Sequence, residues 1–284
     1  MSDSSGEAAH PLLTPRDVRR LLAAHAVAPR KTHGQNFVVD PNTVRKTVRD
    51  AGVRPGELVC EVGPGVGSLT RALRAAGARV VAVEIDAGLV RVLQTTLGWD
   101  PQVRVVHGDA LSVDLAVLVD GGPAAFVANL PYNVATPLVL DALAAGVFTR
   151  LHVMVQREVG ERWAARVGGP QYGAVSVKMA AFADVAVVAA VSRAAFYPVP
   201  NVESVTVRLV PRPWAYPVDR AGLFRLVGAG FSQRRKRLRN ALGAVHPPGA
   251  VEDALRASGL DPGARAEELD LDAWVRLAAT LGVR

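Results

Sequence analysis

The chain has 284 residues, of which half are hydrophobic and 21% are charged, a composition that excludes a disordered protein. The length allows about two domains with sizeable cores. The net charge of +7 favours a polyanionic partner. Cys60 is the only cysteine, which excludes an intrachain disulfide and indicates a reducing compartment, so we expect a cytoplasmic protein.

Three further classes of protein are disfavoured by local patterns. Residues 1–14 are polar and lack the apolar segment of a secretory signal. The charge-free run 121–140 contains three prolines, so it predicts a strand and a loop rather than a membrane-spanning helix. The six histidines form no pair at metal-ligand spacing with each other or with the cysteine, so no metal site is expected.

The N-terminal part predicts a tail, two helices and a loop between them. Residues 1–13 are expected to be disordered. Thr14 and Pro15 are typical of a helix start, and the helix is predicted to run to about His25. Asp40 caps a second helix. The loop 29–38 between them is first basic and then apolar, and it is either a solvated connector or part of a binding site.

The next segment has the pattern of a strand, a glycine turn and a helix. The apolar run 58–60 leads into Glu61-Val62-Gly63-Pro64-Gly65-Val66-Gly67, and 68–73 predicts a helix. Glycines let the backbone approach a ligand closely, so this is the first step of a nucleotide-binding sheet. Phosphates favour a positively polarised helix N-terminus, whereas Glu61 favours S-adenosylmethionine, which carries an ammonium and a sulfonium. A structural turn or a dinucleotide loop would explain the glycines alone.

Three further predicted strands each end in a polar segment: 79–84, 103–106 and 124–128. Glu84 stands 17 residues after Gly67, near the distance at which nucleotide-binding folds place a carboxylate on the ribose hydroxyls. Asp109 would accept from the adenine amine or cap a turn. Ligands bind outside the carboxyl ends of parallel strands, so Glu61, Glu84, Asp109 and Asn129 are expected on one rim.

The second half of the predicted sheet indicates the class of enzyme. A helix at 136–145 and a fifth strand at 151–156 are followed by a helix at 158–167 and a glycine-rich loop. The apolar runs 185–191 and 202–210 have no helix between them, which predicts an antiparallel edge pair. The fold expected is α/β, with the seven-stranded Rossmann-like sheet of class I methyltransferases rather than the all-parallel sheet of dehydrogenases.

Prolines 211 and 213 mark the predicted boundary between a methyltransferase domain, 14–211, and a small all-helical C-terminal domain, 212–284. Helical patterns are predicted at 223–231, 232–242, 250–257 and 271–281. The second of these carries a basic cluster: Arg234, Arg235, Lys236, Arg237 and Arg239. Such a cluster predicts binding to RNA phosphates through counterion release, although a solvated helix face is the alternative.

The segment Asn129-Leu130-Pro131-Tyr132 has a specific chemical use. The exocyclic N6 of adenine is a poor nucleophile, because its lone pair is delocalised into the ring. The Asn129 side-chain oxygen and the Leu130 carbonyl would each accept one N6 hydrogen bond and hold the nitrogen in line for attack. Pro131 fixes the turn. Tyr132 and Phe196 would stack on an unstacked adenine, or else are core aromatics.

The chain resembles the ribosomal RNA adenine N6-dimethyltransferase family over residues 30–243, and most of all its bacterial small-subunit branch. Seven colinear motifs carry the resemblance: Gly34-Gln35-Asn36-Phe37, Glu61-Val62-Gly63-Pro64-Gly65-Val66-Gly67, Glu84-Ile85-Asp86, Gly108-Asp109-Ala110, Asn129-Leu130-Pro131-Tyr132, Phe196-Tyr197-Pro198-Val199-Pro200-Asn201-Val202-Glu203-Ser204 and Phe231-Ser232-Gln233-Arg234-Arg235-Lys236. Small-subunit enzymes of this family dimethylate two adjacent adenines in a hairpin near the 3′ end of 16S rRNA.

The resemblance implies a role for each matched residue. Asn36 and Val38 would line the methionine side of the cofactor pocket, and Gly63 would touch the cofactor through its backbone. Glu84 would hold the ribose and Asp109 the adenine amine. Asn129 would bridge the cofactor and the target amine, while Tyr132 and Phe196 would clamp the target base. Further cofactor contacts are expected at Gln35, Glu61, Gly65, Ile85 and Ala110. Val38 and Glu203 depart from the commoner Leu and Asp.

Three alternative functions are open at this point. A resistance enzyme of the same fold would methylate 23S rRNA, but the Leu130 form and the basic cluster favour the small-subunit branch. A ribosome-assembly or nucleic-acid-binding factor without essential catalysis is disfavoured by the intact Asn129 and Tyr132. A nicotinamide-dependent oxidoreductase is the weakest, since Gly63, Gly65 and Gly67 do not have the G-x-G-x-x-G spacing. We expect a monomer that acts on the small ribosomal subunit.

Overall fold

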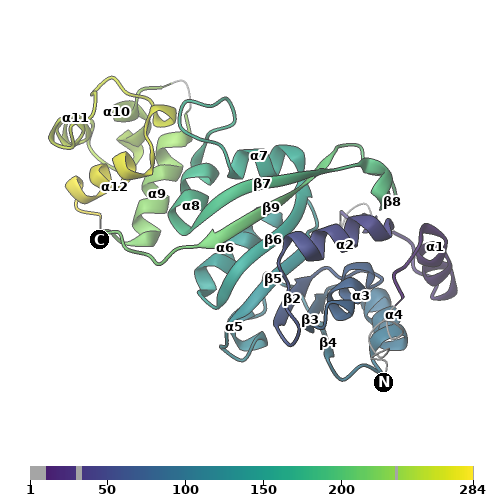
Figure 1. Ribbon diagram of the computed structural model, residues 1–284. Helices are drawn as coiled ribbons and strands as arrows, with labels where there is room; N and C mark the ends of the chain where they lie inside the picture. Colours follow the sequence, from purple (N-terminus) through teal and green to yellow (C-terminus); the bar gives the residue numbers. More distant parts are fainter. Residues whose placement is uncertain (1–10, 30–33, 234–235, 284) are drawn as a thin grey trace. The chain divides into compact units, whose positions relative to one another are not determined.

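The computed structural model describes residues 11–29, 34–233 and 236–283 (Figure 1). Parts of three predictions therefore lie outside the described residues: the tail at 1–10, the loop at 30–33, and Arg234 and Arg235 of the basic cluster. The chain divides into two compact units. Unit 1 contains Met1–Gly160 and Ala186–Pro211, and unit 2 contains Glu161–Val185 and Arg212–Arg284.

A seven-stranded sheet in the order β4-β3-β2-β5-β6-β9-β7 forms the centre of the fold (Figure 1). Strands β2 to β6 pair in parallel, and β9 runs antiparallel to β6. This confirms the predicted class I methyltransferase sheet. The strands are β2 Leu58–Val62, β3 Arg79–Glu84, β4 Val103–His107, β5 Ala124–Asn129, β6 Phe148–Gln156, β7 Ala183–Val191 and β9 Ser204–Pro211.

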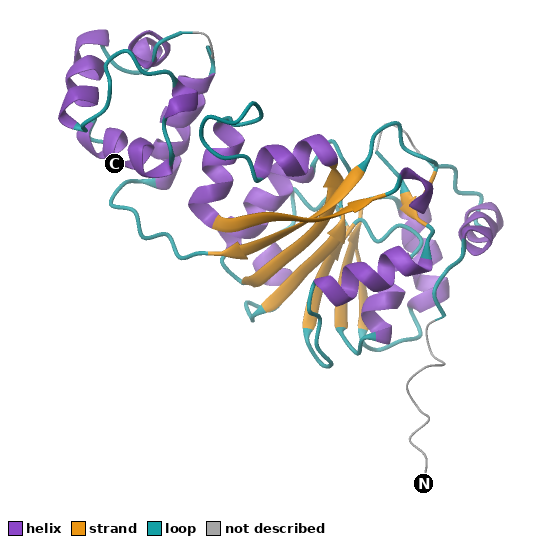
Figure 2. Ribbon diagram, turned by 45° about the horizontal axis from the view of Figure 1, so that its top comes forward, coloured by secondary structure: helices purple, strands orange, loops and turns teal. Residues whose placement is uncertain are grey.

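Helices cover both faces of the sheet (Figure 2). The helices that begin in unit 1 are α1 Pro15–Ala24, α2 Pro41–Asp50, α3 Ser68–Ala75, α4 Ala87–Leu97, α5 Leu115–Leu118, α6 Ala135–Ala145 and α7 Arg157–Trp163. The apolar faces of α2 and α3, with Val48 and Leu73, pack on Val59 and Val127 of the sheet in one buried cluster. Burying each such side chain contributes about 2 kcal/mol, which holds the strands in their order.

The start of α1 corrects the expectation of disorder through residue 13. Thr14 and Asp17 form a reciprocal capping box, in which each side chain accepts from the other residue's backbone N–H. Leu13 is buried in the same cluster as Val18. Apolar residues just before the cap and one turn into the helix pack together as a hydrophobic staple, which orders the chain ahead of the helix.

A second, two-stranded sheet was not predicted. Strand β1, Phe37–Val38, pairs antiparallel with β8, Phe196–Tyr197, and the Val39 N–H donates to the Ala195 carbonyl. Pairs this short and this distant in sequence leave no periodicity to detect. The β1–β8 pair attaches the segment that begins at Gly34 to the rest of unit 1.

Unit 2 is built from five helices of the described chain: α8 Ala174–Phe182, α9 Arg220–Phe231, α10 Leu238–Ala241, α11 Pro248–Ala257 and α12 Leu271–Thr280. Its core contains Val177, Leu223, Leu255 and Trp274, all buried. The sequence analysis had placed 161–185 in the methyltransferase domain and had missed α8. The apolar residues of that helix are distributed around its whole circumference, so it shows no amphipathic period.

Two predicted helices differ from what the structure shows. The helix expected at 158–167 ends at Trp163. The helix expected over 232–242 is wrong, because α9 ends at Phe231 and α10 begins only at Leu238, after an extended Arg237. The charged residues of this segment match the pattern of an exposed helix face, and of its described residues up to 242 only Leu238, Ala241 and Leu242 are buried.

Candidate active site

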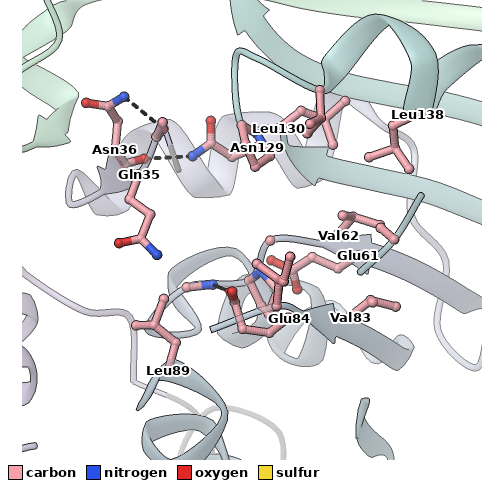
Figure 3. A pocket seen from close by; sticks show the side chains of 18 of the residues that line it. Gln35, Asn36, Glu61, Val62, Val83, Glu84, Leu89, Asn129, Leu130 and Leu138 are labelled. Carbon is pink, nitrogen blue, oxygen red and sulfur yellow. Dashed lines mark hydrogen bonds between the residues drawn. The ribbon is translucent and has the colours of Figure 1, made fainter. Parts of the chain in front are cut away.

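A pocket opens at the carboxyl ends of β2, β3 and β5, where the sequence analysis expected a ligand (Figure 3). Asn36 and Asn129 lie across this pocket from Glu84. All but one of the predicted cofactor and catalytic residues line it: Gln35, Asn36, Val38, Glu61, Gly63, Gly65, Glu84, Ile85, Asp109, Ala110, Asn129, Leu130, Pro131 and Tyr132. The exception is Phe196.

The glycine loop between β2 and α3 needs glycine at each of its three glycine positions. Gly63, Gly65 and Gly67 have φ angles of 70°, 61° and 87°, in the left-handed region that side chains disfavour. A Cβ atom on Gly65 would lie 2.7 Å from the ring of Phe37. The loop therefore brings bare backbone to the pocket wall, with β1 packed directly behind it.

Glu61 is a buried carboxyl group inside this wall, only 1% exposed. The Thr70 hydroxyl donates a 2.7 Å hydrogen bond to its Oε2. Burial, together with the charge of Glu84, raises the pKa of Glu61 to about 8 despite that hydrogen bond. The group is thus held in an environment where a cationic ligand would favour its charged form.

Glu84 ends β3 and faces the same pocket. Its Oε2 accepts from the Gly65 N–H at 3.1 Å, and its Oε1 accepts from the Asp86 N–H at 3.0 Å. Burial raises the pKa of Glu84, although these backbone hydrogen bonds oppose the shift. The two N–H groups fix the carboxylate plane, and each oxygen keeps a further lone pair for a ligand hydroxyl.

One part of the pocket lining combines the carboxyl group of Asp109 with apolar side chains. Asp109 accepts from the Leu111 N–H at 3.0 Å and is otherwise exposed. Ile85 and Leu111 line the pocket and are both exposed. Sequence reasoning missed Leu111, Leu89 and Ser68 as lining residues, because apolar and small residues next to a motif carry no chemical signal of their own.

Asn129 is oriented by a residue 93 positions away in the sequence. Its Nδ2 donates to the Asn36 carbonyl at 2.9 Å, so the amide is fixed with Oδ1 as its remaining acceptor. The Leu130 N–H donates to the Met154 carbonyl at 3.0 Å, which holds the following peptide at the end of β5. Two carbonyl-type acceptors are thereby set on one short segment of the pocket wall.

The two predicted aromatic residues are in different environments. Tyr132 is half-buried, lines the pocket, and its hydroxyl lies 2.8 Å from that of Ser204. Phe196 is 2% exposed and belongs to the core cluster of α2, α3 and the sheet. In this conformation Phe196 acts as a core residue through its pairing with Val38, and its ring lies outside the pocket lining.

The charge of the pocket distinguishes between cofactor classes. Its described lining contains three carboxyl groups and no lysine, arginine or histidine. A pyrophosphate would be repelled there, whereas a ligand with an ammonium, a sulfonium, a ribose and an adenine has a partner for each part. The residues present therefore fit S-adenosylmethionine and do not fit a nicotinamide dinucleotide.

The described part of the basic cluster lies in unit 2. Lys236 and Arg237 are exposed, while Arg239 is half-buried and forms a 3.2 Å ion pair with Glu252. Arg237 also pairs with Arg265 in an isolated antiparallel bridge, so a further basic residue is adjacent to the cluster. Sequence reasoning missed Arg265 because it is distant along the chain.

Two kinds of feature are absent from the described residues. No group of three or more His, Cys, Asp or Glu side chains is placed to hold a metal ion. No helix among them is both long enough and apolar enough to span a membrane.

The model of the ribosomal RNA adenine dimethylase family matches residues 27–282 of this chain. The chain belongs to the ribosomal RNA adenine dimethylase family. The protein is therefore an S-adenosylmethionine-dependent methyltransferase. The positive charges of that cofactor fit the three carboxyl groups of the pocket.

Two relatives of this chain match it over nearly its whole length. Ribosomal RNA small subunit methyltransferase A of Thermobifida fusca is 49% identical, over 94% of this chain and 95% of its own. The protein of the same name from Streptomyces griseus is 48% identical, with 94% of each covered. The crystal structure of 23S rRNA methyltransferase ErmE is 30% identical with a TM-score of 0.64, and it covers 87% of this chain and 100% of its own.

Proposed function

We propose that this protein transfers methyl groups from S-adenosylmethionine to N6 of two adjacent adenines in the 3′-terminal hairpin of small-subunit (16S) rRNA. The product is N6,N6-dimethyladenosine, formed during ribosome biogenesis in the cytoplasm. Relatives named as small-subunit methyltransferases, 46–49% identical over nearly the full chain, support this substrate. The Asn129 amide, fixed by the Asn36 carbonyl inside the pocket, is the observation that carries the chemistry.

The pocket residues would divide the cofactor between them. The bound cofactor supplies an electrophilic methyl group on a sulfonium. Glu84 would accept from the ribose hydroxyls and Asp109 from the adenine amine, with Ile85 and Leu111 against the adenine ring. Asn36, Val38 and the Gly63 backbone would surround the methionine part. Glu61 would offset its positive charge.

The target amine would be activated by orientation rather than by a base. Asn129 Oδ1 and the Leu130 carbonyl each accept one hydrogen bond from N6, which aligns the nitrogen lone pair for attack. Because Asn129 Nδ2 and the Leu130 N–H are already bonded, both acceptors are in place before the adenine arrives. The proton leaves after transfer, when the methylated nitrogen is strongly acidic.

Tyr132 would stack on the flipped adenine, since its ring borders the pocket. Phe196 would supply the second face only if its ring left the core cluster, so it is the less supported of the two. Stacking offsets part of the cost of unstacking the adenine, about 1–3 kcal/mol for each base.

The basic cluster of unit 2 would bind rRNA phosphates; in the sequence, Arg234 and Arg235 directly precede Lys236 and Arg237, which are exposed. Replacing Lys236 and Arg237 by alanine should reduce the slope of log affinity against log salt by about 2. An unchanged slope would assign RNA binding to other residues. Arg239→Ala is the comparison variant, because its ion pair with Glu252 already offsets its charge.

The deciding experiment measures methyl transfer from labelled S-adenosylmethionine to three substrates: undermethylated small subunits, large subunits and protein-free 23S rRNA. Label on small subunits, recovered as N6,N6-dimethyladenosine, supports the proposal. Label confined to protein-free 23S rRNA would instead identify a resistance methylase, the second candidate favoured by the likeness to ErmE. Cofactor binding without transfer to any substrate would indicate an assembly factor. Sedimentation would test the expected monomer.

A further inference from the structure

The hydroxyl groups of Tyr132 and Ser204 lie 2.8 Å apart, a hydrogen bond between residues 72 positions apart in the chain. Ser204 is 0% exposed, and its hydroxyl reaches the aromatic residue at the pocket edge. Ser204 itself is outside the pocket lining, so it would act through Tyr132 rather than on a ligand.

The backbone around Ser204 is held by several contacts. Ser204 is the first residue of β9 and is paired with Gln156 across the antiparallel ladder to β6. Just before it, the Glu203 carbonyl accepts from the Arg157 N–H at 2.9 Å, and the Glu203 carboxylate pairs with the Arg157 guanidinium at 2.5 Å. The serine hydroxyl therefore projects from a fixed position in the sheet.

Tyr132 is in the opposite situation. It lies on the loop between the end of β5 at Asn129 and the start of α6 at Ala135, and is only half-buried. A tyrosine ring on such a loop keeps rotational freedom unless its far end is attached. The bond to Ser204 attaches the ring at its hydroxyl, so the ring is held at both ends.

We propose that Ser204 is a positioning residue that fixes the Tyr132 ring in the orientation required to stack the target adenine. This inference rests on the proposed function. The bond would act on transfer more than on docking, because the proposed function assigns RNA-phosphate binding to the basic cluster of unit 2 rather than to Tyr132. A typical buried hydrogen bond predicts a three- to tenfold fall in kcat when it is removed, with KM for subunits and affinity for S-adenosylmethionine nearly unchanged.

The test combines Ser204→Ala, Tyr132→Phe and the double variant. If the two hydroxyls act as one unit, the double variant is no slower than the slower single variant. Thr206→Val is the matched control: Thr206 lies two residues along β9, is also buried, and its hydroxyl has no hydrogen-bond partner among the described residues. It should keep wild-type kcat. Full activity in Ser204→Ala, or losses that multiply in the double variant, would overturn the inference.

A measurement on the protein without substrate separates this inference from the proposed function. The chain has four tyrosines, so ¹³C-tyrosine spectra can be assigned with Tyr132→Phe. Ser204→Ala should shift or broaden the Tyr132 ring signals, and Thr206→Val should leave them unchanged. Unaltered signals in Ser204→Ala overturn the attachment of the ring. If Ser204→Ala does shift the Tyr132 signals but the wild-type protein methylates no rRNA, the proposed function is overturned, and with it the role assigned to Ser204.

Discussion

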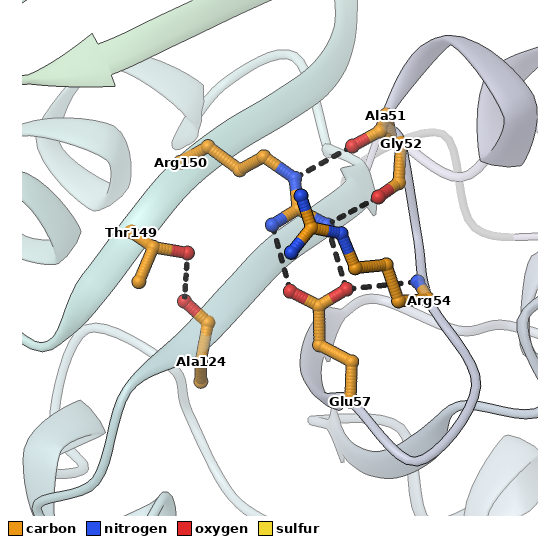
Figure 4. A network of polar contacts seen from close by, with 7 residues as sticks. All are labelled: Ala51, Gly52, Arg54, Glu57, Ala124, Thr149 and Arg150. Carbon is orange, nitrogen blue, oxygen red and sulfur yellow. Dashed lines mark hydrogen bonds and ion pairs between the residues drawn. The ribbon is translucent and has the colours of Figure 1, made fainter.

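The two ends of strand β2 carry glutamates in opposite environments. Glu57, just before the strand, is held by Arg150, whose Nη1 and Nη2 donate to the two carboxylate oxygens at 2.7 Å (Figure 4). The same guanidinium donates to the Ala51 and Gly52 carbonyls. Glu61, near the other end, has a threonine hydroxyl as its partner and no cation in the described pocket lining.

The pKa values of these two glutamates follow from that difference. Burial raises the pKa of Glu57, but hydrogen bonds and charge from Arg150 and Arg54 outweigh burial and leave it below the ordinary value. At Glu61 burial is not offset, and the pKa rises to about 8. The ion pair of Glu57 thus stabilises the fold, whereas Glu61, which has no cationic partner in the described pocket lining, is available to a ligand.

The largest effect is expected from Asn129→Ala, which removes the acceptor at the binding end. Transfer should fall by about 10³-fold, the loss typical of removing one oriented group from an active site. Affinity for S-adenosylmethionine and the free energy of unfolding should change little. Steady-state kinetics with isothermal titration would check both, and normal activity would refute activation by orientation.

Arg150→Met should affect the other end of β2 alone. It leaves Glu57 partly buried without its bidentate partner, and we expect a loss of about 3 kcal/mol in the free energy of unfolding, measured with urea. Activity per folded molecule should stay at the wild-type level. Arg54→Met is the control, because the exposed Arg54 reaches Glu57 through its backbone N–H, which the variant keeps. Equal losses in both variants would contradict the role of the bidentate pair.

Glu61→Gln should stabilise the protein without ligand. Between the unfolded pKa near 4.5 and the folded pKa of about 8, only the folded chain keeps the Glu61 proton, so stability falls as pH rises through this window. Glutamine removes this dependence and should raise the unfolding free energy at pH 8 by about 4 kcal/mol. Cofactor affinity should weaken about tenfold.

The same substitution at Glu57 is the comparison for Glu61→Gln. Glu57→Gln should destabilise the protein at neutral pH, because it loses charge-assisted hydrogen bonds to Arg150. Urea unfolding at pH 6 and pH 8 would measure both variants. Destabilisation by both substitutions would contradict the expectation that only Glu57 stabilises the fold.

His152 lies on β6, two residues after Arg150, and is a buried titratable group between the two ends of the sheet. It is 1% exposed, and neither ring nitrogen has a hydrogen-bond partner among the described residues. Burial lowers the pKa of His152 to about 4, with Lys46, Arg208 and Arg150 adding to the shift and Asp50 opposing it. The folded protein therefore keeps it neutral.

The protonation of His152 makes the stability of the protein depend on pH. Between pH 6.5 and pH 4 the unfolded chain binds a proton at His152 that the folded chain does not, so stability is complete above pH 6.5 and falls with pH below it. From pH 7 to pH 5 this costs about 2 kcal/mol. His152→Phe should flatten the profile by that amount. Parallel profiles for wild type and His152→Phe would contradict the expected titration.

The sequence by itself determined the succession of strands and helices that forms the sheet and the polar ends of four of its strands. Parallel strands have their carboxyl ends on one edge, so Glu61, Glu84, Asp109 and Asn129 could be assigned to one pocket from their positions after apolar runs. The glycine spacing determined a loop of left-handed residues. These features are local, and each depends on a few consecutive residues.

Only the tertiary structure decided which distant groups complete that pocket. The Asn36 carbonyl on Asn129, the β1–β8 pair, Ser204 against Tyr132, and Arg150 on Glu57 each join segments at least 72 residues apart along the chain. The burial of Phe196, where a pocket residue had been expected, is likewise a result of packing. A hydrogen bond or a core contact between distant segments leaves no periodicity in either one, because its geometry is set by the sheet that lies between them.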